Sequence, residues 1–171
     1  MPNQKIIETP YPLIDADPHA TRVVRYFRTS DWATWAAGTA AFPTSLALWE
    51  MADPSKQRMR TSLRLGGLLG FVGGFLLAYQ RSSFRFWGWS ENAREEAMDL
   101  AELRQRVKEG KSLYGESDQP EHVQASAYRN SAFSQLKFQA FPMFNFVNHP
   151  WHGTDPAKYG VKSEGEETSS E

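Results

Sequence analysis

The sequence contains no cysteine, which excludes disulfide frameworks, iron–sulfur clusters, thiol catalysis and cysteine-ligated zinc. It also lacks an excess of either charge, because 19 basic and 20 acidic residues leave a net charge of −1. Without a basic field to gather polyanions, no nucleic-acid partner is expected. The N-terminus has no signal-peptide core, and Glu8, Asp15 and Asp17 interrupt any acid-poor organelle presequence. Any organelle address is therefore expected to lie inside the mature chain.

Two uncharged runs in the first half of the chain have the length of short membrane spans. Residues 32–49 hold 18 uncharged residues, about 27 Å as a helix, with tryptophans at both ends. Residues 65–80 hold 16, about 24 Å as a helix. A charged connector separates the two runs. This pattern favours a transmembrane hairpin over two core helices of a soluble domain, and Pro43 is expected to kink the first helix.

The second run is unusually rich in glycine for a helix. Gly66, Gly70 and Gly74 lie four residues apart and so form one smooth face. Helices in lipid associate through close backbone approach at such small residues. The first run carries a similar row of small residues, also four apart: Ala33, Ala37, Ala41 and Ser45. We predict that both rows are helix-packing faces, either within the hairpin or against a larger membrane protein.

Arginines stand at the ends of the second run and just beyond it. Arg64 and Arg81 bracket residues 65–80, and Arg85 follows among boundary aromatics. Guanidinium groups at such positions extend towards lipid headgroups. We therefore predict lipid contacts at these three arginines, with a structural phospholipid such as cardiolipin as the one ligand to consider.

The predicted organisation has four parts and an all-α fold. Residues 1–28 form an extended, then amphipathic, N-terminal segment; residues 29–81 form the transmembrane hairpin; and residues 82–110 hold boundary aromatics and a polar helix. Residues 111–171 form a long extended docking tail with a disordered acidic end. Prolines interrupt the aromatic stretch of this tail, so we expect its rings to dock into another chain. The predicted docking residues are Phe138, Phe141, Phe144, Phe146 and Trp151.

No pattern in the sequence indicates a catalytic or metal site. His149 and His152 are spaced like metal ligands, with Asp155 nearby, but Pro150 lies between them and no further ligand is close. Asp15 and Asp17 precede a proline and are interpreted as turn residues. Asp31, at the start of the first run, is interpreted as a helix cap. We expect no catalytic residue, no cofactor, no metal and no small-molecule substrate.

The stretches "YPLIDADPHATRVVRYFR" (11–28), "SDWATW", "RFWGWSEN" and "FNFVNHPWHG" resemble a known family. Over roughly residues 8–160 the chain is similar to the fungal 21 kDa (20.9 kDa) accessory-subunit family of mitochondrial respiratory complex I. The resemblance implies a non-catalytic subunit in the mitochondrial inner membrane. Its partners would be complex I membrane-arm subunits and lipids, and its role would be to stabilise and help assemble that arm.

Two other functions are compatible with the residues alone. A membrane-shaping or contact-site hairpin could associate with itself through the glycine face, although this would leave the aromatic tail without a purpose. A small membrane enzyme, or a subunit that binds a quinone or lipid, would need polar groups that converge near the spans. Only Asp31, Glu50 and the arginines are available for that.

Overall fold

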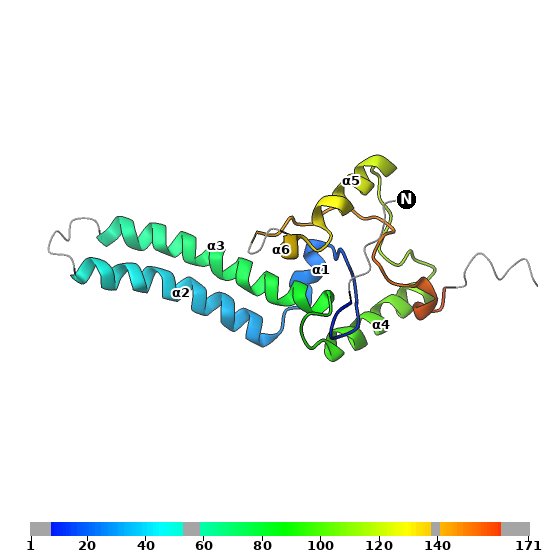
Figure 1. The fold of residues 1–171 in the computed structure, drawn as a ribbon, viewed down its shortest axis with the longest axis horizontal. Coiled ribbons are helices and arrows are strands. Elements are labelled where there is room, and N and C mark those ends of the chain that lie inside the picture. Colours follow the sequence, from blue (N-terminus) through cyan, green and yellow to red (C-terminus); the bar gives the residue numbers. More distant parts are fainter. Residues whose placement is uncertain (1–7, 53–58, 138–140, 162–171) are drawn as a thin grey trace, which may run out of the picture.

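The computed structural model describes residues 8–52, 59–137 and 141–161, and within these ranges every regular element is a helix (Figure 1). This agrees with the predicted all-α class. In chain order the elements are α1 (Ala20–Arg25), α2 (Thr29–Ala52), α3 (Met59–Phe86), α4 (Ala93–Lys108), α5 (Glu121–Ser131), α6 (Ser134–Lys137) and the short 3₁₀ helix η1 (Pro156–Tyr159). Helices α2 and α3 form a long antiparallel hairpin that projects from a head containing the other elements (Figure 1).

The two helices of the hairpin approach each other most closely where glycines face one another. A Cβ atom added to Gly38 of α2 would lie 2.8 Å from the Cα of Gly74 in α3. Gly66, Gly70 and Gly74 are all buried in this contact. Such distances leave no room for a methyl group, so the glycines allow the two backbones to pack directly.

Both helices of the hairpin extend beyond the predicted runs 32–49 and 65–80. Among the described helices, α3 alone is long and apolar enough to cross a membrane, with a mean hydropathy of 1.5 over its most apolar window. Alanine, threonine and serine make α2 less apolar. Crossing by α3 is therefore compatible with its length and composition, and the second span stays a prediction.

The hydrophobic core lies in the head and around the adjoining end of α3. Its largest fully buried side chains are those of Tyr26, Phe86 and Ile14, which come from α1's C-terminal cap, α3 and the N-terminal segment. The N-terminal segment runs between the end of α3 and the C-terminal region. The Ile14 N–H donates to the Phe86 carbonyl (3.0 Å), and the Ala16 N–H donates to the His152 carbonyl (2.8 Å). The two ends of the chain thus fold together around α3.

A positive backbone angle at Gly88 allows the chain to turn from α3 towards α4. Its φ is +73°, and a Cβ there would lie 2.3 Å from the Tyr11 carbonyl oxygen. The Tyr11 N–H donates to the Gly88 carbonyl in the same contact (3.1 Å). Glycine is required here by both the conformation and the close approach.

The C-terminal region differs from the predicted extended tail. Residues 121–137 are largely helical, and the later segment packs onto the head through buried side chains. The sequence did not predict that the C-terminal region packs onto the head, because the apolar residues of this region form no core among themselves. Instead they complete the core of the N-terminal segment and α3, as the contact between Trp87 and Phe133 shows (ring centroids 5.7 Å apart). The predicted disordered end lies outside the described residues.

Candidate functional site

Two groups of charged side chains, all buried except the partly exposed Arg28, are the most unusual feature of the head. The first, here called the head charge cluster, consists of Asp15, Asp17, Arg22, Asp99, His149 and His152. The second, here called the base charge cluster because it lies where the hairpin meets the head, consists of Arg28, Asp31, Arg85 and Glu95. Burying charge is unfavourable unless the groups are paired, so the partners of these residues determine what the clusters do.

In the head charge cluster, the N-terminal segment and the C-terminal segment are joined by two aspartate–histidine pairs. The Asp15 carboxylate lies 2.7 Å from Nδ1 of His152, and the Asp17 carboxylate lies 2.8 Å from Nε2 of His149. The two imidazole rings stack with centroids 4.6 Å apart. The Asn145 side chain donates to the Asp17 backbone carbonyl as well (3.1 Å). More than a hundred residues separate the members of each pair along the sequence.

An aspartate–histidine pair is also the base of many hydrolytic sites, but here both nitrogens of each ring are engaged within the protein. Nε2 of His152 lies 2.7 Å from the His149 carbonyl, which can only accept, so this nitrogen carries a proton. Nδ1 of His149 accepts from the Trp151 N–H (3.2 Å). Neither ring presents a free nitrogen to a substrate. The geometry therefore supports a structural cross-link between the chain ends rather than acid–base chemistry.

Arg22 connects this cluster to α4. Its guanidinium group donates to Asp15 (3.1 Å) and to Asp99. The Tyr159 hydroxyl of η1 donates to the other oxygen of Asp99 (2.8 Å). One arginine therefore ties together the N-terminal segment, α1 and α4, and Asp99 extends the network to η1.

The environments of the carboxylates shift their pKa values in different directions. Burial raises the pKa of Asp15, but His152, Arg22 and the Asp17 N–H together hold it below its usual range. Burial also raises the pKa of Asp17, and here the hydrogen bonds from His149 and Ser131 do not offset it, so the net shift is upward. Of the two aspartates, Asp15 is thus the one whose charged form is favoured by the folded protein.

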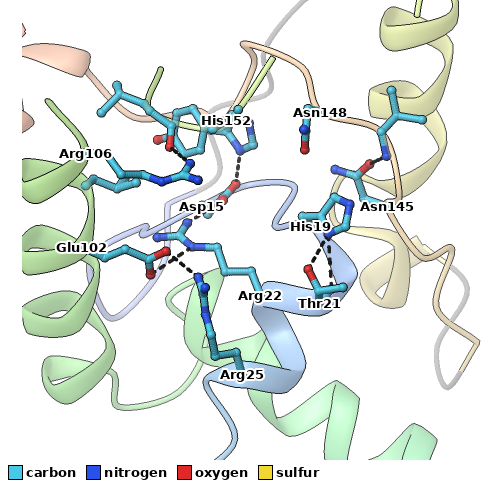
Figure 2. A pocket seen from close by; sticks show the side chains of 15 residues that line it. Asp15, His19, Thr21, Arg22, Arg25, Glu102, Arg106, Asn145, Asn148 and His152 are labelled. Atoms are coloured by element: carbon cyan, nitrogen blue, oxygen red, sulfur yellow. Dashed lines mark hydrogen bonds and ion pairs between the residues drawn. The ribbon is translucent and has the colours of Figure 1, made fainter. Parts of the chain in front are cut away.

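A cavity of about 300 Å³ opens beside the head charge cluster (Figure 2). Three arginines and two carboxylates line it: Arg22, Arg25, Arg106, Asp15 and Glu102. Figure 2 shows these side chains converging from α1, α4 and the N-terminal segment, with His19 and Thr21 at the N-terminal end of α1. Basic side chains therefore outnumber carboxylates in this lining. Within the described residues no group of three or more metal-ligating side chains is present.

The base charge cluster fixes the hairpin to the head. Arg28 binds Glu95 of α4 with two hydrogen bonds (2.8 and 2.6 Å). Arg85 of α3 pairs with Asp31 of α2 and lies 3.4 Å from Glu95. Asp31 also accepts from the Arg28 N–H (2.7 Å), so it caps α2 from the third position of the helix and not from the N-cap position expected from the sequence. The ion pairs of Asp31 were not predicted from the sequence. They join α2, α3 and α4 at one point.

The predicted helix-packing rows do not face each other. Gly66, Gly70 and Gly74 pack against Trp35, Gly38, Thr39, Pro43 and their neighbours. The four small residues of the other row lie on the exposed side of α2: Ala33, Ala37, Ala41 and Ser45. The tryptophan ring of Trp35 and the close contact at Gly38 determine which side of α2 meets α3. Packing of the small row against another protein stays a prediction.

Of the three arginines predicted to contact lipid, Arg85 is placed differently. Its side chain is buried and ion-paired, so that part of the prediction is wrong. A carboxylate on each neighbouring helix holds it inside the protein, which the sequence could not show. Arg64 is exposed, and Arg81 is half-exposed with its Nε 3.4 Å from Asp31. Lipid contact at these two stays a prediction.

The predicted docking aromatics divide into exposed and buried members. Phe141 and Phe146 are 73% and 68% exposed, whereas Phe144 packs edge-on against Tyr79 of α3 (4.8 Å). Trp151 is only 8% exposed and lies in the core, so its prediction as a docking residue is wrong. Its ring fills space beside Tyr128 and His149 of the same chain. Phe138 lies outside the described residues.

Comparison with known proteins gives consistent results over nearly the whole chain. Residues 8–91 match the sequence model of the family described as NADH-ubiquinone oxidoreductase complex I, 21 kDa subunit. Residues 100–170 match the model described as the C-terminal of NADH-ubiquinone oxidoreductase 21 kDa subunit. The NADH-ubiquinone oxidoreductase 20.9 kDa subunit of Neurospora crassa is 48% identical over 165 residues, covering 95% of this chain and 87% of the relative.

Proposed function

Because this chain belongs to the NADH-ubiquinone oxidoreductase complex I 21 kDa subunit family, we propose that it is a non-catalytic accessory subunit of mitochondrial complex I. We place it in the inner membrane, attached to the membrane arm. There it stabilises the arm and helps it assemble by filling space between other subunits. Electron transfer and proton translocation belong to other chains.

The observation that carries this proposal is the contrast between the hairpin and the head. Large apolar side chains remain exposed along α2 and α3, among them Leu48, Trp49, Leu65, Leu68, Leu69 and Phe71. An apolar surface of this extent requires lipid or protein around it. In the head, by contrast, buried charges are satisfied by one another and the histidine nitrogens are occupied. A chain that is internally cross-linked at one end and apolar on its surface at the other is suited to a scaffold role.

The first test is whether the chain is found in the assembled complex. Mitochondrial membranes are solubilised in mild detergent and resolved by native electrophoresis, then stained for NADH dehydrogenase activity and probed for this chain. The proposal expects co-migration with the activity band. Migration as a small assembly away from that band would contradict it and favour the self-associating hairpin.

A pair of matched variants tests whether the chain is attached to the complex through the hairpin surface. Leu68→Arg places a charge on the exposed face of α3, which costs about 2.5–3.5 kcal/mol at the centre of a membrane helix. We expect this variant to be lost from the activity band. Leu136→Arg makes the same change at an exposed leucine of α6 in the head and should leave co-migration unchanged. Co-migration of both variants with the activity band would show that the hairpin surface is not the attachment site.

A strain without the chain tests the stabilising role itself. We expect a weaker activity-stained band and smaller membrane-arm subassemblies in its place. An activity band of full intensity that survives prolonged detergent treatment would argue against a stabilising role while leaving membership of the complex untouched.

A further inference from the structure

Helix α1 has two neighbouring faces of different chemistry. Ala20 and Val24 lie one turn apart and line an apolar groove of about 450 Å³. Thr21 and Arg25 are also one turn apart, on the adjacent face, and line the polar cavity. Thr21 belongs to the lining of both spaces. A molecule that is apolar at one end and charged at the other would meet both faces at once.

The rest of the groove is formed by aromatic side chains of two segments. Phe75 and Tyr79 come from α3, and Phe144 and Phe146 come from the C-terminal segment. The rings of Phe144 and Phe75 are 6.3 Å apart. Phe146 remains 68% exposed at the edge, so the groove is open at this side.

The groove lies at the depth of a membrane boundary if α3 crosses the membrane. Tyr79 is one residue from the end of the uncharged run 65–80, and Phe75 lies four residues deeper, about 6 Å along the helix axis. The apolar surface of the groove is therefore continuous with the apolar surface of α3. Lipid at this level has its acyl chains beside Phe75 and its headgroup beside the first residues of the head.

Arg25 supplies a charge of the right sign at the mouth of the cavity. Its side chain is 60% exposed and pairs with Glu102 through Nη2. Within the described part of the chain, its Nε and Nη1 atoms have no hydrogen-bond partner. The Thr21 hydroxyl and backbone N–H on the same face both donate to Nδ1 of His19 (2.8 and 3.3 Å), so Arg25 is the side chain of α1 that has donors left for a ligand. Three arginines against two carboxylates give the cavity lining an excess of basic side chains, which favours an anionic headgroup.

We propose that α1 is the wall of a phospholipid site, with an acyl chain in the groove at Val24 and Phe144 and the phosphate at Arg25. The occupant is an anionic phospholipid of the surrounding membrane. The site rests on the proposed function insofar as α3 must lie in the membrane. It differs from the arginines predicted by sequence, because it uses α1 rather than the residues flanking the second run.

A photoreactive phospholipid tests the site in the assembled complex. Phosphatidylglycerol carrying a diazirine in one acyl chain is added to purified complex I in nanodiscs, irradiated, and adducts on this chain are mapped by mass spectrometry. We expect adducts on the peptides that contain Val24 and Phe144. Val24→Trp fills the groove and should reduce these adducts at least about fivefold, since the chain then has no space. Val72→Trp, at an exposed site of α3, should leave them unchanged.

The phosphate contact has its own matched pair of variants. Arg25→Gln and Glu102→Gln both remove the ion pair between these two side chains, and the amide oxygen of Glu102→Gln can still accept from the Tyr26 hydroxyl. Only Arg25→Gln removes the charge proposed to bind phosphate, so it should lower adduct yield about fivefold, the effect of one basic residue near an anionic membrane. Glu102→Gln should leave the yield unchanged or raise it. Because neither substitution changes the groove, this pair decides the question even if Val24→Trp fails to fold.

Two outcomes would overturn the lipid site. One is the formation of adducts on the exposed face of α3 and none at the groove, which would mean that a neighbouring protein covers the groove. The other is equal adduct yield in the Arg25→Gln and Glu102→Gln variants. Co-migration with the activity band is scored for every variant, so a failure of complex I membership is seen separately from a failure of the lipid site.

Discussion

Substituting alanine for Gly74 should weaken the hairpin, whereas the same substitution at the neighbouring Gly73 should not. A Cβ at Gly74 would lie 2.7 Å from the Trp35 carbonyl oxygen and 3.2 Å from the Thr39 nitrogen, both backbone atoms of α2. At Gly73 no atom lies within 4 Å of the added carbon. The two positions are adjacent in one helix, so they differ only in the direction that the added methyl group takes.

The size of the effect follows from two opposing contributions. Replacing glycine by alanine inside a helix favours the helix by about 1 kcal/mol, and this gain is common to both positions. Forcing a methyl group into a packed contact costs about 1–3 kcal/mol. The difference in free energy of unfolding between Gly74→Ala and Gly73→Ala is therefore expected to be about 1–3 kcal/mol, with Gly73→Ala neutral or stabilising.

Denaturant unfolding of the full-length chain in detergent micelles measures this difference. Helix loss followed by far-ultraviolet circular dichroism is a suitable signal, because both helices of the contact unfold with it. Gly70→Ala should behave like Gly74→Ala, since its Cβ would lie 2.9 Å from the Thr39 carbonyl oxygen. Gly67→Ala should behave like Gly73→Ala. If all four variants lose stability equally, close approach of the helices is not the reason for the glycines.

Three further predictions concern the head and its junction with the hairpin. Asp31→Ala removes the nearest carboxylate from the buried Arg85, which keeps only the 3.4 Å contact with Glu95, and should lower the free energy of unfolding by about 3–5 kcal/mol. Arg81→Gln, at an exposed partner of Asp31, should change it by less than about 1 kcal/mol in the same denaturant titration. The pKa of Asp15 is lower in the folded protein than in the unfolded chain, so its ionised carboxylate stabilises the fold above the unfolded pKa. This contribution is lost as the pH falls through the folded pKa. Asp15→Asn should therefore flatten the decline in melting temperature below about pH 4. Trp151→Ala should cost about 3–5 kcal/mol by emptying a core site, whereas Phe141→Ala should change stability by less than about 0.5 kcal/mol and instead weaken retention in complex I on native gels.

The hairpin was predictable because its evidence is local. The glycine spacing at 66, 70 and 74 and the two uncharged runs each lie within one helix, where residues four apart share a face. The orientation of α2 was not predictable in the same way. Its alanine row is smoother than the face that actually meets α3, but the rings of Trp35 and Phe71 pack in the contact (centroids 5.1 Å apart). Small residues alone did not determine the packing face.

The buried charges of the head show a different limit of sequence reasoning. In the sequence, Asp15 and Asp17 stand close to a proline, which indicates a turn, and His149 and His152 have the spacing of metal ligands without a further ligand nearby. Each interpretation considered only nearby residues, whereas the actual partners are 137 and 132 positions apart. The same limit explains Trp151, whose core is made by segments that its own neighbourhood does not contain.

The ion pairs at the base of the hairpin have a consequence for how the subunit behaves as a whole. Asp31 lies in the first turn of α2, Arg85 in the last turn of α3 and Glu95 in α4, so one buried contact joins both helices of the hairpin to the head. A flexible linker at this point would let the head move independently of the hairpin. Buried and mutually paired charges oppose such movement, because separating them would leave each desolvated group without its partner. The head is therefore held at a fixed orientation to the hairpin.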